Sequence, residues 1–129
     1  MNKRILLVDD EESLLEISSL ILERAGYEVF TASKVPEAYK LSVEHTPFLC
    51  LTDLKLSNSI DGATLAGQIK RTNPYVVCVA VTGYLTSFDK GYLLGIGSFT
   101  DILLKPVEME LLLEVVSYAQ RKYERWKSY

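Results

Sequence analysis

The chain has 129 residues, of which 48% are hydrophobic and 24% are charged, and its formal net charge is -3. This length suits one domain with a buried core, and the acidity argues against a general nucleic-acid-binding protein. No apolar run is long enough to cross a bilayer, and the acidic residues after MNKRILLV argue against a signal peptide. Cys50 and Cys78 lie in apolar runs, so we expect reduced core residues of a cytoplasmic protein, without a disulfide.

Short apolar runs alternate along the chain with segments of helical periodicity. The runs are rich in Val, Ile and Leu with little polar alternation, which is typical of parallel strands buried on both faces. They predict five strands, at Ile5–Val8, Tyr27–Thr31, Phe48–Thr52, Val76–Val81 and Ile102–Leu104. Five helices are predicted between and after them, around Leu14–Leu22, at Pro36–Glu44 and Gly62–Arg71, within Ser87–Leu94, and after Pro106.

This alternation predicts an α/β fold with a doubly wound, five-stranded parallel sheet in the flavodoxin-like order 2-1-3-4-5. We expect the domain to cover residues 1–120 and a C-terminal helical extension to cover residues 121–129. The last helix has an apolar stripe from Met109 to Trp126, and it is longer than a strand of ordinary length. Its final turns are therefore expected to project beyond the sheet with Tyr123 and Trp126, as a connection to a neighbour or a dimer contact. The alternative is that these two rings fold back on the domain or that the helix end frays.

Polar residues whose side chains could bind a metal or take part in catalysis follow four of the five predicted strands. Asp9 and Asp10 follow the first strand, Asp53 the third, Thr82 the fourth and Lys105 the fifth. In a sheet of this order, ligands bind beyond the carboxyl ends of the strands, between strands 1 and 3. The sequence therefore predicts one convergent site.

Three neighbouring carboxylates repel one another unless a cation compensates their charge. An all-oxygen site without a Cys/His cluster favours Mg²⁺ over zinc or copper. Asp10 and Asp53 are the expected direct ligands, Asp9 assists, and the backbone carbonyl of Lys55 is a further candidate ligand.

A carboxylate nucleophile beside magnesium can accept a phosphoryl group and become an acyl phosphate. Asp53 is the predicted acceptor, while the Lys105 ammonium and the Thr82 hydroxyl would each contact a phosphoryl oxygen. Each of these residues alone also fits a helix start, a turn or a strand exit. Their joint occurrence at successive strand ends is what favours a single site.

Four motifs carry these residues: ILLVDDEE, CLTDLKL, VAVTGY and DILLKP. With them, the chain from about residue 3 to residue 120 resembles the receiver domains of two-component response regulators, of the chemotaxis-regulator type. The resemblance implies that Asp53 takes a phosphoryl group from a histidine of a sensor kinase or a phosphotransfer protein. It also implies that Asp9 and Asp10 are the magnesium acids, Thr82 the switch hydroxyl and Lys105 the phosphate-sensing lysine, followed by a cis Lys105–Pro106 bond.

The chain departs from the family pattern at three places. Ser57 stands where a proline is usual, in a loop that is one residue longer. Ile102 occupies the position of the switch aromatic, three residues before Lys105, and the turn before it is also longer. Phe99 could replace that aromatic ring, but a role in the core or in loop packing is favoured for it. Tyr84 is a candidate shield of an acyl phosphate against water.

The leading interpretation is a phosphoacceptor switch that is not an enzyme apart from its own magnesium-dependent phosphorylation and slow dephosphorylation. A homodimer is expected through the fourth helix, fifth strand and last helix, or through the last helix alone. The alternative is a phosphorylation-independent dimerising adaptor on the same fold. An aspartate-nucleophile phosphatase is disfavoured because Lys55 stands where such enzymes need a second acid. His45, the single histidine, is predicted at a helix end far from the site.

Overall fold

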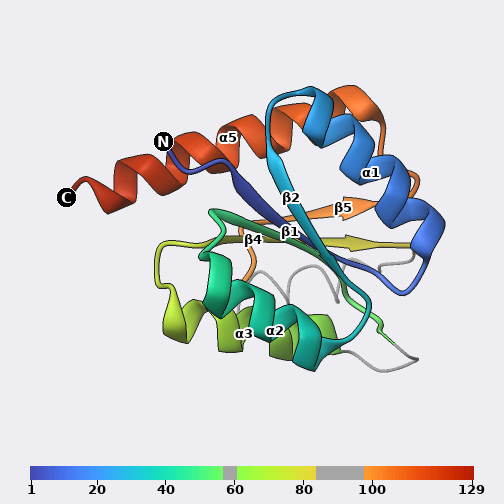
Figure 1. Cartoon of the computed structure of the whole chain (residues 1–129), viewed down its shortest axis with the longest axis horizontal. Helices are drawn as coiled ribbons and strands as arrows, with labels where there is room; N and C mark the ends of the chain where they lie inside the picture. Colours follow the sequence, from blue (N-terminus) through green and yellow to red (C-terminus); the bar gives the residue numbers. More distant parts are fainter. Residues whose placement is uncertain (57–60, 84–97) are drawn as a thin grey trace.

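The computed structural model of the chain describes residues 1–56, 61–83 and 98–129 (Figure 1). Its strands are β1 (Arg4–Val8), β2 (Glu28–Ala32), β3 (Leu49–Asp53), β4 (Val77–Thr82) and β5 (Asp101–Leu104). Its helices are α1 (Glu12–Arg24), α2 (Val35–His45), α3 (Asp61–Thr72) and α5 (Met109–Lys127). The described residues thus form four helices rather than the five predicted, because the helix expected within Ser87–Leu94 lies outside them.

The five strands form one sheet in the order β2-β1-β3-β4-β5, and each neighbouring pair is parallel. The predicted flavodoxin-like order is therefore confirmed. In the register of the sheet, Leu6 of β1 is the partner of Cys50 of β3, which is in turn the partner of Cys78 of β4. Because all strands run the same way, their carboxyl ends lie along one edge.

Helices cover both faces of the sheet. Figure 1 shows α1 and α5 on one side and α2 and α3 on the other. Strand β1 serves both layers, since Leu6 and Val8 pack in the cluster with α2 and α3, while Ile5 and Leu7 pack in the cluster with α1 and α5. This two-sided burial explains why the strands are nearly continuous apolar runs. Each such fully buried side chain contributes about 1.5–3 kcal/mol of transfer free energy.

Local sequence sets where the helices begin and end. Pro36 lies in the first turn of α2, where its missing N–H costs nothing. Helix α2 stops at Thr46, which takes the left-handed conformation with φ 43° and donates its N–H to the Ser42 carbonyl. Helix α1 is followed by Gly26 with φ 100°, a conformation that glycine adopts without strain.

The end of α5 is held by the N-terminal segment. Tyr123 is only 2% exposed, so the expectation that its ring projects beyond the domain is wrong. The Asn2 N–H donates to Glu124 over 2.8 Å, and Gln120 donates to the Asn2 carbonyl over 2.6 Å. Trp126 is partly buried against the same core cluster. These contacts anchor the helix through residue 124, whereas its last residues extend past the sheet in Figure 1.

Cys50 and Cys78 are buried and free, as predicted. The hydrogen bond that the Cys50 thiol donates to the Cys78 side chain, reinforced by burial, raises the pKa of the Cys50 thiol well above its usual value. Both therefore behave as core residues. No helix in the described parts of the chain is long and apolar enough to span a membrane.

Candidate functional site

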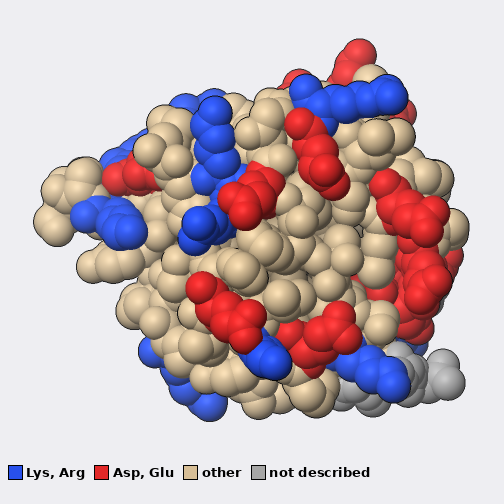
Figure 2. Space-filling model, in the orientation of Figure 1, with Lys and Arg blue, Asp and Glu red and all other residues tan. Residues whose placement is uncertain are grey.

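The predicted site residues come together at the carboxyl edge of the sheet. Asp9 directly follows β1, Asp53 and Thr82 end β3 and β4, and Lys105 directly follows β5. Asp9 and Asp53 are each 8% exposed and Thr82 is 4% exposed, which is unusual for polar side chains. Figure 2 shows acidic side chains gathered at the right of the view, on the side where α1 begins in Figure 1.

Backbone hydrogen bonds fix these residues in place. The Asp9 N–H donates to the Ala32 carbonyl over 3.1 Å, which ties the end of β1 to β2. The Lys105 N–H donates to the Thr82 carbonyl over 2.8 Å, which continues the pairing of β4 and β5 past the strand. The Lys105–Pro106 peptide bond is cis, as the family resemblance implied.

Helix α3 begins against the end of β3. The Gly62 N–H donates to the Leu54 carbonyl over 3.1 Å. A methyl group at Gly62 would overlap the backbone carbonyl of Asp53 and crowd Leu54. Only glycine fits at this position, because any side chain would overlap the backbone of β3. The close contact between Gly62 and this backbone helps fix the position of the Asp53 carboxylate.

Lys105 is the counter-ion of the site. Its Nζ lies 2.8 Å from Asp9 Oδ2, 3.0 Å from Asp53 Oδ2 and 3.8 Å from Glu11 Oε1. Burial by itself lowers the pKa of Lys105, but hydrogen bonds and charge from Asp9 and then Asp53 outweigh burial, so the pKa is raised. The ammonium therefore stays charged and holds the two buried carboxylates together.

Each carboxylate also has a backbone donor. Asp9 Oδ1 accepts the N–H of Glu11 over 3.0 Å, and Asp53 Oδ1 accepts the N–H of Lys55 over 3.2 Å. This hydrogen bond involves the N–H of Lys55 and not its backbone carbonyl, whose role as a metal ligand stays a prediction. What the structure adds is that the Lys55 amide orients Asp53.

The acids have the composition of a magnesium site. Carboxylate oxygens of Asp9, Asp10 and Asp53 all lie within 4.8 Å of one another. Asp10 is exposed and makes no ion pair within the described residues. Three carboxylates against the one ammonium of Lys105 leave a charge of about -2, and a hard divalent cation with oxygen ligands matches that excess.

Ile102 and Phe99 belong to the core on the side of α2 and α3. They are 7% and 3% exposed, respectively. The core role favoured for Phe99 is thus confirmed, and Ile102 presents no hydroxyl or ring that could move. The expectations for Ser57 and Tyr84 concern residues outside the described parts of the chain.

Two features of the site could hardly be predicted from the sequence. Glu11 approaches Lys105 although it is 59% exposed, and an acidic run after a strand gives no hint of this contact. A groove lined by α1 also opens beside Asp53. Only the apolar stripe of α1 could have indicated it.

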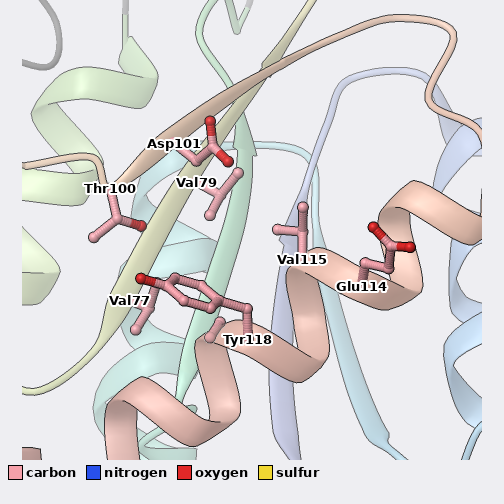
Figure 3. Close-up of a pocket in the computed structure, with 8 residues that line it drawn as sticks. Val77, Val79, Thr100, Asp101, Glu114, Val115 and Tyr118 are labelled. Carbon is pink, nitrogen blue, oxygen red and sulfur yellow. The ribbon is translucent and has the colours of Figure 1, made fainter.

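A second hollow, of about 450 Å³, lies away from the acids (Figure 3). It is bounded by Val77 and Val79 of β4, Asp101 at the start of β5, and Val115 and Tyr118 of α5. None of the predicted site residues lines it. Chemistry at the strand ends therefore does not involve this hollow.

The model of the response regulator receiver domain family matches residues 5–117. Among curated proteins, the alkaline phosphatase synthesis transcriptional regulatory protein PhoP of Bacillus subtilis is 37% identical over 106 residues, which are 82% of this chain and 43% of that protein. The response regulator protein PilR of Pseudomonas aeruginosa is 32% identical over 119 residues, 92% of this chain and 26% of that protein. The chain thus spans less than half the length of either relative.

Solved structures show the same likeness. A CheY-like receiver domain protein from Methanospirillum hungatei has a TM-score of 0.87 and 30% identity, covering 97% of this chain and 98% of that one. The beryllofluoride-activated NtrC4 receiver domain dimer has a TM-score of 0.85 and 30% identity, covering 94% and 98%.

Proposed function

The chain belongs to the response regulator receiver domains, the phosphoacceptor switches of two-component signalling, and we propose that Asp53 is its phosphoacceptor. The observation that carries the proposal is the pairing of the buried Asp53 carboxylate with Lys105, which also holds Asp9. Lys105 thus brings the proposed nucleophile Asp53 and the proposed metal acid Asp9 into contact with one cation. This is the set of groups that phosphoryl transfer to a carboxylate requires.

In the proposed transfer, an Asp53 carboxylate oxygen forms a bond to phosphorus while the bond from phosphorus to the donor breaks. With a phosphohistidine donor, the ring nitrogen leaves with the electron pair of the P–N bond, and the histidine becomes a neutral imidazole with its proton on the other ring nitrogen. The incoming oxygens add negative charge, which the Lys105 ammonium offsets on one side. The Thr82 hydroxyl donates to another phosphoryl oxygen.

Asp9, Asp10 and Asp53 would hold Mg²⁺, with the Lys55 carbonyl as a further ligand. When bound, the ion offsets the repulsion between these carboxylates and the phosphoryl group. Lys105 must then share Asp9 and Asp53 with a second cation. Its ammonium, on a four-carbon stem, can shift toward the phosphoryl oxygens without movement of the backbone.

We further propose that the natural donor is a sensor histidine kinase or a histidine phosphotransfer protein in the cytoplasm. A small phosphodonor should also phosphorylate Asp53, and water should slowly remove the group. No contact within the described residues favours the phosphorylation-independent adaptor.

A homodimer is the proposed signalling form. The solved NtrC4 receiver is described as a dimer in its activated state, and this chain exposes Leu104 of β5 and Leu111 and Tyr118 of α5. Light scattering should give a larger mass after phosphorylation. An unchanged monomer mass would contradict dimerisation alone, because the acceptor chemistry is measured separately.

The acceptor role is tested by incubating the protein with acetyl phosphate and Mg²⁺ and measuring intact mass. We expect one phosphoryl adduct in the wild type and none in Asp53→Asn. Adduct formation should fall when EDTA removes the metal. An equal adduct in Asp53→Asn would assign the acceptor to another residue.

A further inference from the structure

A groove of about 440 Å³ lies between helix α1, the sheet and the segment after β5, and one end opens beside the acidic site. Its volume lies in the range of small-molecule sites. Its floor and walls are mainly apolar and include Leu7, Leu51, Val81, Leu14, Ile21 and Val107.

Helix α1 leaves its apolar stripe incompletely covered at this groove. Leu14, Ile17, Ser18 and Ile21 follow the i, i+3, i+4, i+7 spacing of one helix face, and all four line the groove. Such a stripe is ordinarily buried, yet Leu22 is the one buried residue of α1 and Ile17 is 58% exposed. Ser18 has the smallest side chain of the four.

The charged end of the groove determines whether a positively or a negatively charged ligand is favoured. Asp9, Glu11 and Asp53 line it together with Lys105, so three carboxylates face one ammonium. The local excess of about -2 repels an anion and attracts a cation. Among these three acids Glu11 is the one most weakly paired with Lys105, because its only ion pair within the described residues is the 3.8 Å contact with that lysine.

We propose that this groove binds a small organic cation with an apolar body. The body lies along the stripe of α1, and the cationic group approaches Glu11 and Asp9. Binding depends on the shape and charge of the groove, and the unphosphorylated chain is sufficient for it. A cation held there competes with Mg²⁺, because both draw on the carboxylate of Asp9.

Three naphthalene probes test the proposal by isothermal titration of the unphosphorylated full chain. They are 2-naphthylmethylammonium, neutral 2-naphthalenemethanol and anionic 2-naphthoate, which share one ring system and differ in charge. We expect the ammonium to bind at least about tenfold more tightly than the naphthoate, with the alcohol between them. Adding Mg²⁺ should weaken the ammonium and leave the alcohol unchanged.

Two substitutions locate the binding. Ser18→Trp fills the groove and should reduce ammonium affinity at least about tenfold, whereas Leu20→Trp, on the exposed part of the same helix, should not. Glu11→Gln should weaken the ammonium severalfold without affecting the alcohol, and this arm holds even if Ser18→Trp folds poorly. Equal affinities for the three probes, or no binding of the ammonium, would overturn the proposal.

Discussion

The ammonium of Lys105 lies 3.0 Å from the carboxylate of Asp53, so the proposed nucleophile has a counter-ion within the chain itself. The same ammonium contacts Asp9 at 2.8 Å. One lysine from the end of β5 therefore bridges the ends of β1 and β3. The stability of the site and its chemistry depend on the same three side chains.

Removing this bridge should destabilise the metal-free protein. In Lys105→Met, two nearly buried carboxylates lose their charged donor, and we expect a loss of about 1–3 kcal/mol in the free energy of unfolding. Urea unfolding in EDTA measures it. Lys40→Met is the control, because Lys40 is 77% exposed and its only ion pair among the described residues is with Glu44; it should change stability by less than about 0.5 kcal/mol.

Magnesium should restore more stability to Lys105→Met than to the wild type. An ion that binds the folded chain alone stabilises it by mass action, and without the lysine the acids are free to bind that ion. Repeating the urea titrations in Mg²⁺ measures the difference. Equal gains in the two proteins would mean that Lys105 and the metal do not share the carboxylates.

The contribution of Lys105 should also depend on pH. Its pKa is raised in the folded chain by Asp9 and Asp53 against the opposing effect of burial. A raised pKa means that the stabilisation is fully present below the unfolded lysine value of about 10.4 and is lost as pH rises through the folded pKa. The stability difference between wild type and Lys105→Met should therefore be constant from neutral pH to about 10 and then shrink. A difference that grows above that pH would contradict the ion-pair assignment.

Gly62→Ala should destabilise the start of α3. The added methyl meets the Asp53 carbonyl and Leu54, and we expect a loss of about 1–3 kcal/mol from this overlap. Gly67→Ala is a matched control in the same helix, where the nearest atom, Ser98 Oγ, is 4.0 Å away. It should stabilise the chain by about 0.5–1 kcal/mol through helix propensity. Thermal unfolding of both variants distinguishes overlap from propensity, and equal shifts would refute the overlap.

Ile102 is expected to act as a core residue and not as part of the phosphorylation chemistry. Ile102→Ala should cost about 2–5 kcal/mol because the side chain is buried. Leu104→Ala, two residues along the same strand and 57% exposed, should cost less than about 0.5 kcal/mol. Adduct formation with acetyl phosphate, measured below the unfolding temperature, should remain within about twofold of wild type, a change below 0.5 kcal/mol in barrier. A much slower adduct would place Ile102 in the site.

The residues at the strand ends could be predicted from the sequence for a simple physical reason. Parallel strands that alternate with helices bring their carboxyl ends to one edge, so Asp9, Asp53, Thr82 and Lys105 had to meet once the order of strands was known. Strand bounds shifted by at most one residue and those of α1 by two, which is within the usual scatter.

The position of Tyr123 could not be predicted in the same way. Its ring packs in the core cluster beside Phe48, and Asn2, more than a hundred residues earlier, contacts α5 through side-chain and backbone hydrogen bonds. Periodicity describes one helix face and carries no information on such a distant partner. The contact of Glu11 with Lys105 and the groove along α1 were missed for the same reason.

The most direct test of the central claim is to locate the phosphoryl group chemically. After incubation with acetyl phosphate and Mg²⁺, borohydride reduction converts an aspartyl phosphate to homoserine, and peptide mass spectrometry then finds the modified position. We predict homoserine at position 53 alone, formed only when phosphodonor and Mg²⁺ are both present. Homoserine at Asp9 or Asp10, or none at position 53, would contradict the assignment of Asp53 as the phosphoacceptor.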